Sequence, residues 1–343
     1  RVFVTSALED GTRRQLHCLD RDTGQRIWMR EIGDDNPEIT SALTGHAAST
    51  PVTDGKHVVA FFGNAGLVAF DFQGQLLWHH NFGEFESELG IASSPIVVGD
   101  QVIQVCDHDG KFYRTFDSFM ICLDVATGRQ VWRANRRGLE RSWSTPIVVP
   151  AGDERPELIV NAEEALRGYS PDTGDLLWQV RGMTGWVTPS PVYAAGLIFA
   201  TSGKDGPLMA IRPGGKADAT STHVAWQHKR GGPYVCSPLV YRGRLYVLNE
   251  FGVLNCYRAS NGERLFRQRL AGKFTASAVA VAGHLMFTNE SGRTYVLAAA
   301  DDFRLASENQ LENGCLASPA ISQGKLFLRT EQHLWCIAKP GGK

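Results

Sequence analysis

The sequence lacks long apolar runs, an excess of charge of either sign and a recognisable export leader. No run approaches the roughly 18 apolar residues that a membrane-spanning helix needs. The first residues, RVFVTSALEDG, contain no charged, apolar and cleavable signal. The 35 Lys and Arg residues nearly balance the 36 Asp and Glu residues, for a formal net charge of -1. We therefore expect neither a membrane span nor binding to nucleic acid through the overall field of the chain.

Motifs of common enzymes and metal proteins are also missing. There is no GxSxG, no HExxH, no phosphate-binding glycine loop and no Ser/His/Asp ordering, so the sequence supports neither a hydrolase nor a nucleotide-binding protein. The seven cysteines are an odd number and include no CxxC pair. The cysteines therefore indicate neither a zinc site nor a disulfide framework, and we interpret them as small structural side chains.

What the sequence does have is a globular composition and an internal repeat. Hydrophobic residues make up 43% and charged residues 21% of the chain, enough to bury a large core. A small hydroxyl residue followed by proline recurs about every 45 residues, a period typical of a four-stranded propeller blade. The copies are Thr50-Pro51, Ser94-Pro95, Thr145-Pro146, Ser190-Pro191, Ser237-Pro238 and Ser318-Pro319, with Ser277-Ala278 as a degenerate copy.

Each repeat has the pattern of four short strands. The signature is followed by two apolar runs around a glycine turn, as in SPLVYRGRLYVLN, which is typical of a β-hairpin. A third run such as MICLDVATG leads to an outer strand that ends in an aromatic residue. We expect these aromatic rings to fill the wedge between diverging blades. They are Trp28, Trp78, Trp132, Trp178, Trp226 and Phe266.

The repeats predict an all-β fold, an eight-bladed β-propeller of four-stranded antiparallel blades, with seven blades as the alternative. A single sheet of this kind cannot bury both faces, so the sheets must stack on one another. The chain begins inside one repeat and ends inside another, which favours radial closure into a single domain over residues 1–343. We expect the first blade to lack its inner strand and the last its outer strand, unless residues upstream of Arg1 supply them.

The blocks LDRDTGQRIW, LDVATGRQVW and SPDTGDLLW resemble the tryptophan-docking repeat of the pyrroloquinoline-quinone-like β-propellers. The resemblance covers nearly the whole chain. That superfamily includes quinone-dependent alcohol dehydrogenases, the lipoprotein propeller of the bacterial outer-membrane assembly machine, and many exported propellers of unassigned role. FFGNAGLVAFD and RSWSTPIVV look most like the exported propellers of planctomycete-type bacteria. The resemblance implies a periplasmic or otherwise exported protein.

The quinone-dependent dehydrogenases resemble one another in a pair of adjacent cysteines, a calcium site and a catalytic aspartate. No two cysteines are adjacent in this chain, and only residues 107–119 and 213–222 form excursions longer than a turn. We therefore expect no cofactor and no catalytic residue, and we predict a non-catalytic exported binding or scaffold propeller. The alternative is an oxidoreductase that uses pyrroloquinoline quinone with calcium to oxidise alcohols or sugars. A carbohydrate lyase or hydrolase would need carboxylates and a His or Tyr clustered at the channel mouth.

The loops between second and third strands and the crossovers between blades should emerge on one face, where function is most often found. The first two crossovers are acidic, with Glu31, Asp34, Asp35, Glu38, Glu84, Glu86 and Glu88. The third to sixth are basic, with Arg136, Arg137, Arg141, Arg181, Lys229, Arg230, Arg269 and Lys273. We predict that this bipolar face binds a protein partner or a small polar ligand. Solvated charge without a partner is the alternative.

Two further groups of candidate residues lie in the same loops. Trp143, Trp186 and Tyr234 stand beside cations and could form a stacking wall for a planar or sugar-like ligand, or could plug the channel mouth. Asp107, His108 and Asp109 offer carboxylates and an imidazole on a long loop, the ligand types of a metal site. A tight turn with an exposed histidine is the alternative for them.

Overall fold

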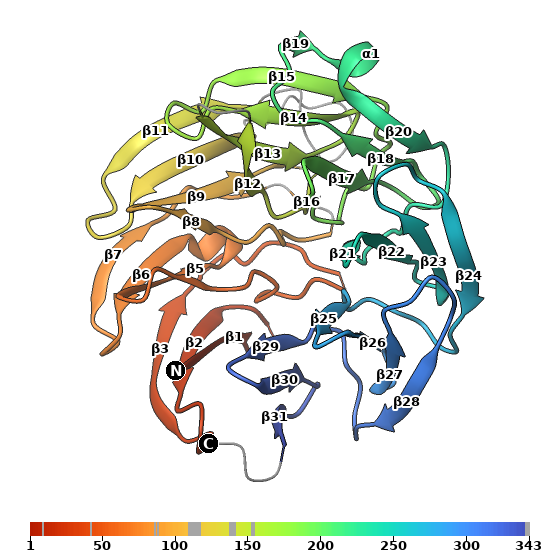
Figure 1. Cartoon of the computed structure of the whole chain (residues 1–343). Helices are drawn as coiled ribbons and strands as arrows, with labels where there is room; N and C mark the ends of the chain where they lie inside the picture. The colour runs from red at the N-terminus through yellow and green to blue at the C-terminus, as the bar shows by residue number, and fades with distance from the viewer. Residues whose placement is uncertain are drawn as a thin grey trace. The chain divides into compact units, whose positions relative to one another are not determined.

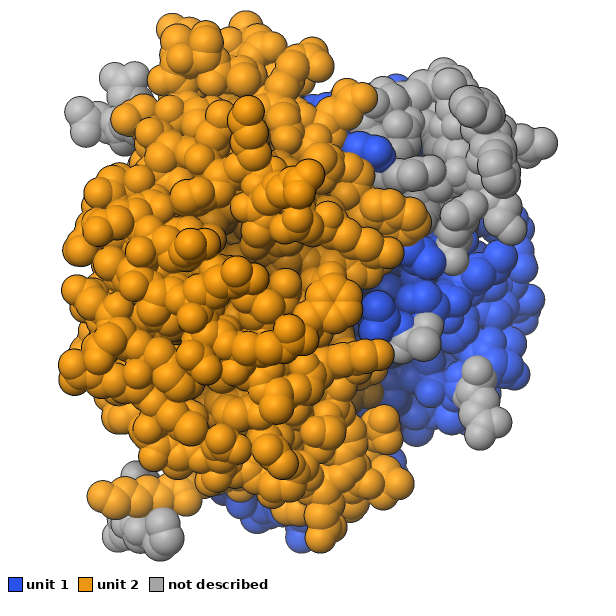
Figure 2. All heavy atoms as spheres, turned by 90° about the vertical axis from the view of Figure 1, so that its right-hand side faces the viewer, with its two compact units in different colours: residues 1–163, 167–178 blue, residues 164–166, 179–343 orange. Residues whose placement is uncertain are grey.

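The computed structural model describes residues 1–8, 10–41, 43–85, 87, 89–108, 118–136, 142–151 and 155–339. The chain divides into two compact units (Figure 2): unit 1 is residues 1–163 and 167–178, and unit 2 is residues 164–166 and 179–343. Within the described residues the helices are α1 (Thr220–His223) and the 3-10 turn η1 (Gly63–Ala65). Neither these nor any other described segment forms a helix long and apolar enough to cross a membrane.

The described strands form eight antiparallel sheets, which are the blades of an eight-bladed β-propeller, as the sequence predicts. The first four sheets are β1 (Val2–Ala7), β2 (Arg13–Leu19) and β3 (Arg26–Gly33); β4 (Val52–Thr53), β5 (His57–Phe61), β6 (Leu67–Asp71) and β7 (Leu76–His80); β8 (Ile96–Val98), β9 (Gln101–Cys106), β10 (Phe119–Asp124) and β11 (Gln130–Asn135); and β12 (Ile147–Ala151), β13 (Arg155–Asn161), β14 (Ala165–Tyr169), β15 (Leu176–Arg181) and β19 (Ala217–Asp218).

The last four sheets belong to unit 2. They are β16 (Val192–Ala194), β17 (Leu197–Thr201), β18 (Leu208–Ile211) and β20 (Val224–His228); β21 (Leu239–Tyr241), β22 (Arg244–Leu248), β23 (Val253–Arg258) and β24 (Arg264–Arg269); β25 (Val279–Val281), β26 (His284–Thr288), β27 (Arg293–Ala298) and β28 (Leu305–Gln310); and β29 (Ala320–Ser322), β30 (Lys325–Arg329) and β31 (Leu334–Ala338). In Figure 1 the inner strands β16, β21 and β25 lie side by side, and β20, β24 and β28 form the rim of the unit.

The incomplete blades are where the sequence places them. The first sheet has three strands and begins with a strand at the second position of the repeat, and the last sheet has three strands and ends with a third-position strand. One feature was not predicted from sequence. Residues 213–222, expected only as an excursion, add the fifth strand β19 to the fourth sheet and the short helix α1.

The hydroxyl residues of the repeat signature link neighbouring inner strands. The backbone N–H of Thr50 donates to the Ser94 hydroxyl at 2.9 Å, and the same bond joins Ser237 to Ser277 at 2.9 Å. Ser277 in turn donates its N–H to the Ser318 hydroxyl at 2.9 Å, although its repeat has lost the proline. Each hydroxyl thereby satisfies a backbone donor of the preceding blade, which explains why serine or threonine recurs at this position.

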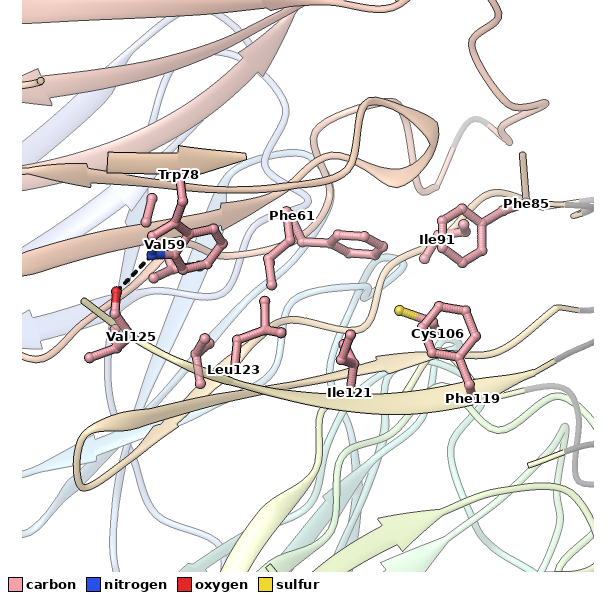
Figure 3. Close-up of a cluster of buried hydrophobic side chains, with 13 residues drawn as sticks. Val59, Phe61, Trp78, Phe85, Ile91, Cys106, Phe119, Ile121, Leu123 and Val125 are labelled. Atoms are coloured by element: carbon pink, nitrogen blue, oxygen red, sulfur yellow. Dashed lines mark hydrogen bonds between the residues drawn. The ribbon is translucent and has the colours of Figure 1, made fainter. Parts of the chain in front are cut away.

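The outer-strand tryptophans join each blade to the next. In Figure 3 the indole of Trp78 lies in the hydrophobic core between the second and third blades, and its Nε1 donates to the Val125 carbonyl at 2.9 Å. The indoles of Trp28 and Trp226 donate in the same way, to Phe72 at 3.0 Å and Ala259 at 2.9 Å. The buried polar end of each ring is therefore satisfied while its apolar body fills the space between sheets.

The glycine of the turn between the third and outer strands, Thr-Gly at Gly128 and Asn-Gly at Gly262, contacts the tryptophan one blade earlier. A Cβ on Gly128 would lie 2.6 Å from Trp78, and one on Gly262 would lie 2.7 Å from Trp226. These glycines also have positive φ angles, +70° at Gly128 and +74° at Gly262. Glycine is thus required twice at this position, by backbone conformation and by the approach of the ring.

The indole of Trp132 also donates to a carbonyl of the next blade, that of Pro171, at 2.8 Å. The remaining two predicted docking residues, Trp178 and Phe266, differ in detail. Trp178 is 1% exposed, and its Nε1 has no hydrogen-bond partner among the described residues. Phe266 is partly buried and packs edge-on against Phe303, with ring centroids 6.1 Å apart. The side chain of phenylalanine carries no N–H group, so this ring contacts the next blade by packing alone.

Candidate functional site

Arg136, predicted on an exposed crossover, is a buried ion-pair residue. Its Nε and Nη2 donate to the two carboxylate oxygens of Asp107 at 2.7 and 2.9 Å, and its Nη1 donates to the Tyr169 hydroxyl at 2.6 Å. The Arg136 side chain is 0% exposed and that of Asp107 is 1% exposed. A bidentate pair of this kind stabilises the interior of unit 1 and does not present a charge to solvent.

The predicted acidic crossovers are also partly neutralised inside unit 1. The buried guanidinium of Arg14 lies 2.9 Å from the Asp34 carboxylate and 3.0 Å from that of Glu38. Glu31 pairs with Arg13 at 2.7 Å on the surface. Asp35 and Glu84 are exposed, whereas Glu86 and Glu88 lie outside the described residues. Asp34 and Glu38 therefore add no free negative charge to the predicted bipolar face, because a buried arginine pairs with both.

The candidate metal ligands are engaged within the protein. Both oxygens of Asp107 accept from Arg136, and the His108 ring packs against Phe85 with centroids 4.9 Å apart. The third residue, Asp109, lies outside the described residues, as do Arg137 and Arg141. Within the described part of the chain no group of three or more His, Cys, Asp or Glu side chains could hold a metal ion. A metal site at this loop stays a prediction.

The described residues do not fit the cofactor of the quinone-dependent dehydrogenases. Their pair of adjacent cysteines has no counterpart, since no two of the seven cysteines are neighbours in the sequence. Six of the seven are buried, and burial raises the pKa of Cys122 and Cys236 to about 12. The described side chains likewise include no group of three or more His, Cys, Asp or Glu residues that could hold a calcium ion.

Trp143, the first of the three predicted stacking residues, is 8% exposed, and its indole Nε1 donates to the Gly90 carbonyl at 2.7 Å. Its ring is therefore buried within unit 1 and presents little surface to a ligand.

Trp186 and Tyr234 meet in unit 2, together with Lys204. Trp186 lies on the crossover from β15 to β16, Lys204 on the loop from β17 to β18, and Tyr234 on the crossover from β20 to β21. The two rings meet edge to face with centroids 6.5 Å apart. The Lys204 ammonium lies 4.8 Å from the Tyr234 centroid and 5.7 Å from that of Trp186. We call these three residues the aromatic–lysine cluster.

The backbone around this cluster is fixed by short-range contacts. Trp186 has a φ of +65°, a conformation unusual for a bulky residue, and its carbonyl accepts from the Gly203 N–H at 3.3 Å. The Asp205 carboxylate accepts from the Gly231 N–H at 3.0 Å, so the loop that carries Lys204 is tied to the crossover that carries Tyr234. The structure thus holds a 36% exposed tryptophan in a strained conformation.

Tyr234 stands between this surface and the next blade. Its backbone N–H donates to the Glu250 carboxylate at 3.3 Å. Burial raises the pKa of Tyr234, and the negative charge of Glu250 raises it further. The phenol is therefore neutral at physiological pH and can donate a hydrogen bond.

Exposed cations and one more aromatic ring lie at the same strand ends of unit 2, on the crossovers β20–β21 and β24–β25 and the loop β22–β23. Lys229, Arg230, Arg269 and Lys273 are exposed. Phe251, next to Glu250 on the loop from β22 to β23, is 58% exposed. Arg181 is exposed as well, but pairs with Asp218 at 3.1 Å. The bipolar character predicted from sequence involves residues of both units and stays a prediction.

The sequence places Trp186 and Tyr234 in this region, and it places the loops of Lys204 and Phe251 on the same face without marking either residue as a site residue. Lys204 belongs to a Lys-Asp-Gly loop that reads as an ordinary tight turn. Only the neighbouring crossovers, distant in sequence, bring the two rings beneath its ammonium group. Phe251 is a single hydrophobic residue in the Asn-Glu-Phe-Gly turn. A large apolar side chain in a turn of otherwise polar and small residues was the available signal.

Comparison of the sequence with known families and proteins identifies BamB relatives in both cases. The family model described as outer membrane protein assembly factor BamB matches residues 1–132, 117–240 and 218–307. The outer membrane protein assembly factor BamB of Yersinia pestis is 21% identical to this chain in an alignment 343 residues long. The alignment covers 95% of this chain and 80% of that protein.

Solved structures show the same fold at low sequence identity. BamB from Moraxella catarrhalis is 13% identical with a TM-score of 0.64, covering 95% of this chain and 92% of that one. The quinohemoprotein alcohol dehydrogenase from Comamonas testosteroni is 12% identical with a TM-score of 0.68, covering 95% of this chain and 68% of that one. The designed Ika8 protein is 12% identical with a TM-score of 0.64, covering 98% and 94%. With its family matches spanning most of the sequence, the chain belongs to the BamB family of pyrroloquinoline-quinone-like β-propellers.

Proposed function

We propose that this protein is a non-catalytic exported scaffold that binds a protein partner through the aromatic–lysine cluster. The observation that carries the proposal is the exposed Trp186 ring, held at positive φ beside Tyr234 and Lys204. Tryptophan and tyrosine are enriched at the energetic centres of protein interfaces. A rigid aromatic surface loses little conformational entropy when a partner covers it.

The surroundings of the cluster favour a partner with an acidic rim. Lys229, Arg230 and Lys273 are exposed in the neighbouring crossovers and would attract carboxylates during the encounter. Phe251 offers a second apolar contact. The family match to an outer membrane protein assembly factor supports a role in assembling other proteins, in an exported compartment.

Site-specific photocrosslinking tests this proposal directly. A photoreactive phenylalanine analogue at position 234 should crosslink a defined protein from an envelope extract of the source organism. The same analogue at position 305 on β28, where Leu305 is 45% exposed, should not. The same adducts at both positions, or adducts at position 305 alone, would contradict the proposed surface.

The crosslinked partner then allows a quantitative measurement. Trp186→Ala should weaken the Kd by about 30-fold or more, the cost of about 2 kcal/mol expected at the centre of an interface. Lys204→Ala should weaken it less, by about 2- to 5-fold, since cation–π contacts at exposed sites are worth about 0.5–1 kcal/mol. Leu305→Ala is the matched control and should leave the Kd unchanged.

We also propose that the protein works without a bound quinone. Titration with pyrroloquinoline quinone and calcium, followed by dye-reduction assays with alcohols and sugars, tests this point. A spectral shift accompanied by turnover would favour the oxidoreductase alternative.

A further inference from the structure

Unit 2 contains an arginine-lined pocket at the ends of its strands opposite to the aromatic–lysine cluster. The pocket has a volume of about 620 Å³. It is formed by the turns β16–β17 and β21–β22 and by the segments that follow β18, β23 and β27. Volumes of this size are typical of sites for small molecules.

The pocket wall carries a strong local excess of positive charge. Its charged lining residues are four arginines and one aspartate, which gives a formal charge of +3. The whole chain has a net charge of -1, so the excess is a local feature. The cations are Arg212, Arg242, Arg244 and Arg258, and the anion is Asp301.

One of the arginines is held in place by the single acid. The Nε and Nη2 of Arg244 each lie 2.7 Å from the same carboxylate oxygen of Asp301, and its Nη1 donates to the Arg242 carbonyl at 2.9 Å. The Nε of Arg258 donates to Glu263 at 3.0 Å. These contacts orient both guanidinium groups, and the carboxylates of Asp301 and Glu263 balance their charges.

The other two arginines have no such anionic partner. Arg212 and Arg242 are exposed, and their guanidinium groups form no hydrogen bond or ion pair with any side chain in the described part of the chain. The Arg242 guanidinium lies 5.4 Å from the ring of the adjacent Tyr241. Arg242 occupies the two-residue β21–β22 turn with φ of +50°, and the strand register between Tyr241 and Arg244 fixes this turn at the pocket rim.

The floor of the pocket is apolar. Leu197, Phe199 and Ala259 contribute to its lining. Phe199 packs against the docking residue Trp226 of the same blade, with ring centroids 5.9 Å apart. Trp226 in turn donates to the carbonyl of Ala259 in the next blade at 2.9 Å, so the apolar lining lies where two blades meet. A preformed apolar floor below two unpaired guanidinium groups suits a ligand with one apolar end and one anionic end.

We propose that this pocket binds a small organic anion whose phosphate or carboxylate group pairs with Arg212 and Arg242 and whose apolar part lies on the floor. Guanidinium groups bind both oxyanions in bidentate geometry, which is why the two anion types share this chemistry. The pocket lies at the other end of the strands from Trp186, so this inference stands independently of the partner surface.

Calorimetric titration at low salt with phenyl phosphate and with benzoate tests the proposal. These probes share a ring and differ in the oxyanion, so the tighter one identifies the anion type. For ligands of this size we expect a Kd of about 1 mM or tighter for at least one probe. Inorganic phosphate alone should bind more weakly than phenyl phosphate, because it makes no contact with the floor.

The variant Arg212→Gln/Arg242→Gln should weaken binding of the better probe at least tenfold, since a hydrogen bond to a charged group contributes about 1.5–3 kcal/mol. The control Arg267→Gln/Arg269→Gln removes two exposed arginines of β24 outside the pocket lining and should leave the Kd unchanged. Unchanged thermal unfolding of both variants establishes that they fold. Failure of both probes to bind, or equal losses in the two double variants, would overturn the proposal.

Discussion

The pairing of a turn glycine with the tryptophan of the preceding blade predicts the effect of one methyl group. Gly128 and Gly24 occupy the same position in their Thr-Gly turns and have similar backbone conformations, with φ of +70° and +73°. They differ in surroundings. A Cβ on Gly128 would lie 2.6 Å from the Trp78 ring, whereas a Cβ on Gly24 meets nothing within 4 Å.

The two substitutions therefore separate a backbone cost from a packing cost. Gly24→Ala should lower the free energy of unfolding by about 1–2 kcal/mol, the cost of a left-handed conformation for a residue with a Cβ. Gly128→Ala carries that cost and must also displace a buried indole, which adds about 1–3 kcal/mol. We expect a total of about 2–5 kcal/mol for Gly128→Ala.

Urea denaturation followed by circular dichroism measures both values. A double-mutant cycle adds a sharper test: in a Trp78→Leu background the ring is gone, and Gly128→Ala should then cost about as much as Gly24→Ala. If Gly128→Ala is no more destabilising than Gly24→Ala in the wild-type background, the proposed contact between ring and turn does not govern blade docking.

Three further predictions concern charge, pH and thiol access. Arg136→Met should lower the free energy of unfolding by about 3–5 kcal/mol, because it leaves the Asp107 carboxylate buried without its partner. The control Arg181→Met breaks an exposed pair and should change it by less than about 1 kcal/mol in the same denaturation assay. Burial raises the pKa of Asp54, but hydrogen bonds from two backbone N–H groups and an imidazole outweigh it and lower the pKa to about 2. A depressed carboxyl pKa contributes stability above the unfolded pKa of about 3.9, and this is lost as the pH falls toward 2. After solvent screening the contribution should be below about 1 kcal/mol, and Asp54→Asn should remove that part of the pH dependence of unfolding between pH 5 and 2. Cys336 is the exposed cysteine, and burial raises the pKa of three of the others to about 12. Mass spectrometry should therefore find one maleimide on the native protein and seven on the urea-unfolded protein. Rapid labelling of several thiols in the native protein would contradict this packing.

The fold could be predicted because its determinants are local and repeated. The hydroxyl–proline signature, the hairpin turns and the outer aromatic residue recur in each repeat, so the errors of any one repeat are corrected by the others. Ser277 illustrates the point: its repeat has lost the proline but keeps the hydroxyl that the neighbouring inner strand needs. Strand β19 could not be predicted in this way, because residues 213–222 have no counterpart in the other repeats. Whether the whole chain unfolds as a single domain stays a prediction.

The candidate site was predicted less completely, because exposure depends on partners that are distant in sequence. Arg136 and Arg230 occupy corresponding crossovers and look alike in the sequence. In the structure Arg136 is buried against Asp107, 29 positions earlier, whereas Arg230 is exposed. A crossover arginine therefore becomes a surface cation or an interior one according to whether the preceding inter-strand loop supplies a carboxylate. The same holds for the aromatic residues, since the carbonyl of Gly90 is what holds Trp143 inside.

The arginine-lined pocket could not be predicted from the sequence repeats. Its wall combines residues from two successive blades. Arg212 follows the third strand of one blade, whereas Arg242 lies in the first turn of the next blade and Arg258 at the end of that blade's third strand. Each residue by itself is an ordinary polar residue at a turn, and the charge balance of the chain gives no hint of them. Only the stacking of successive sheets makes them neighbours. Asp301 and Glu263 balance Arg244 and Arg258, whereas Arg212 and Arg242 form no ion pair with a described side chain. Because like charges placed together lower stability, we propose that a bound anion balances this second pair, and the titration with phenyl phosphate and benzoate tests it.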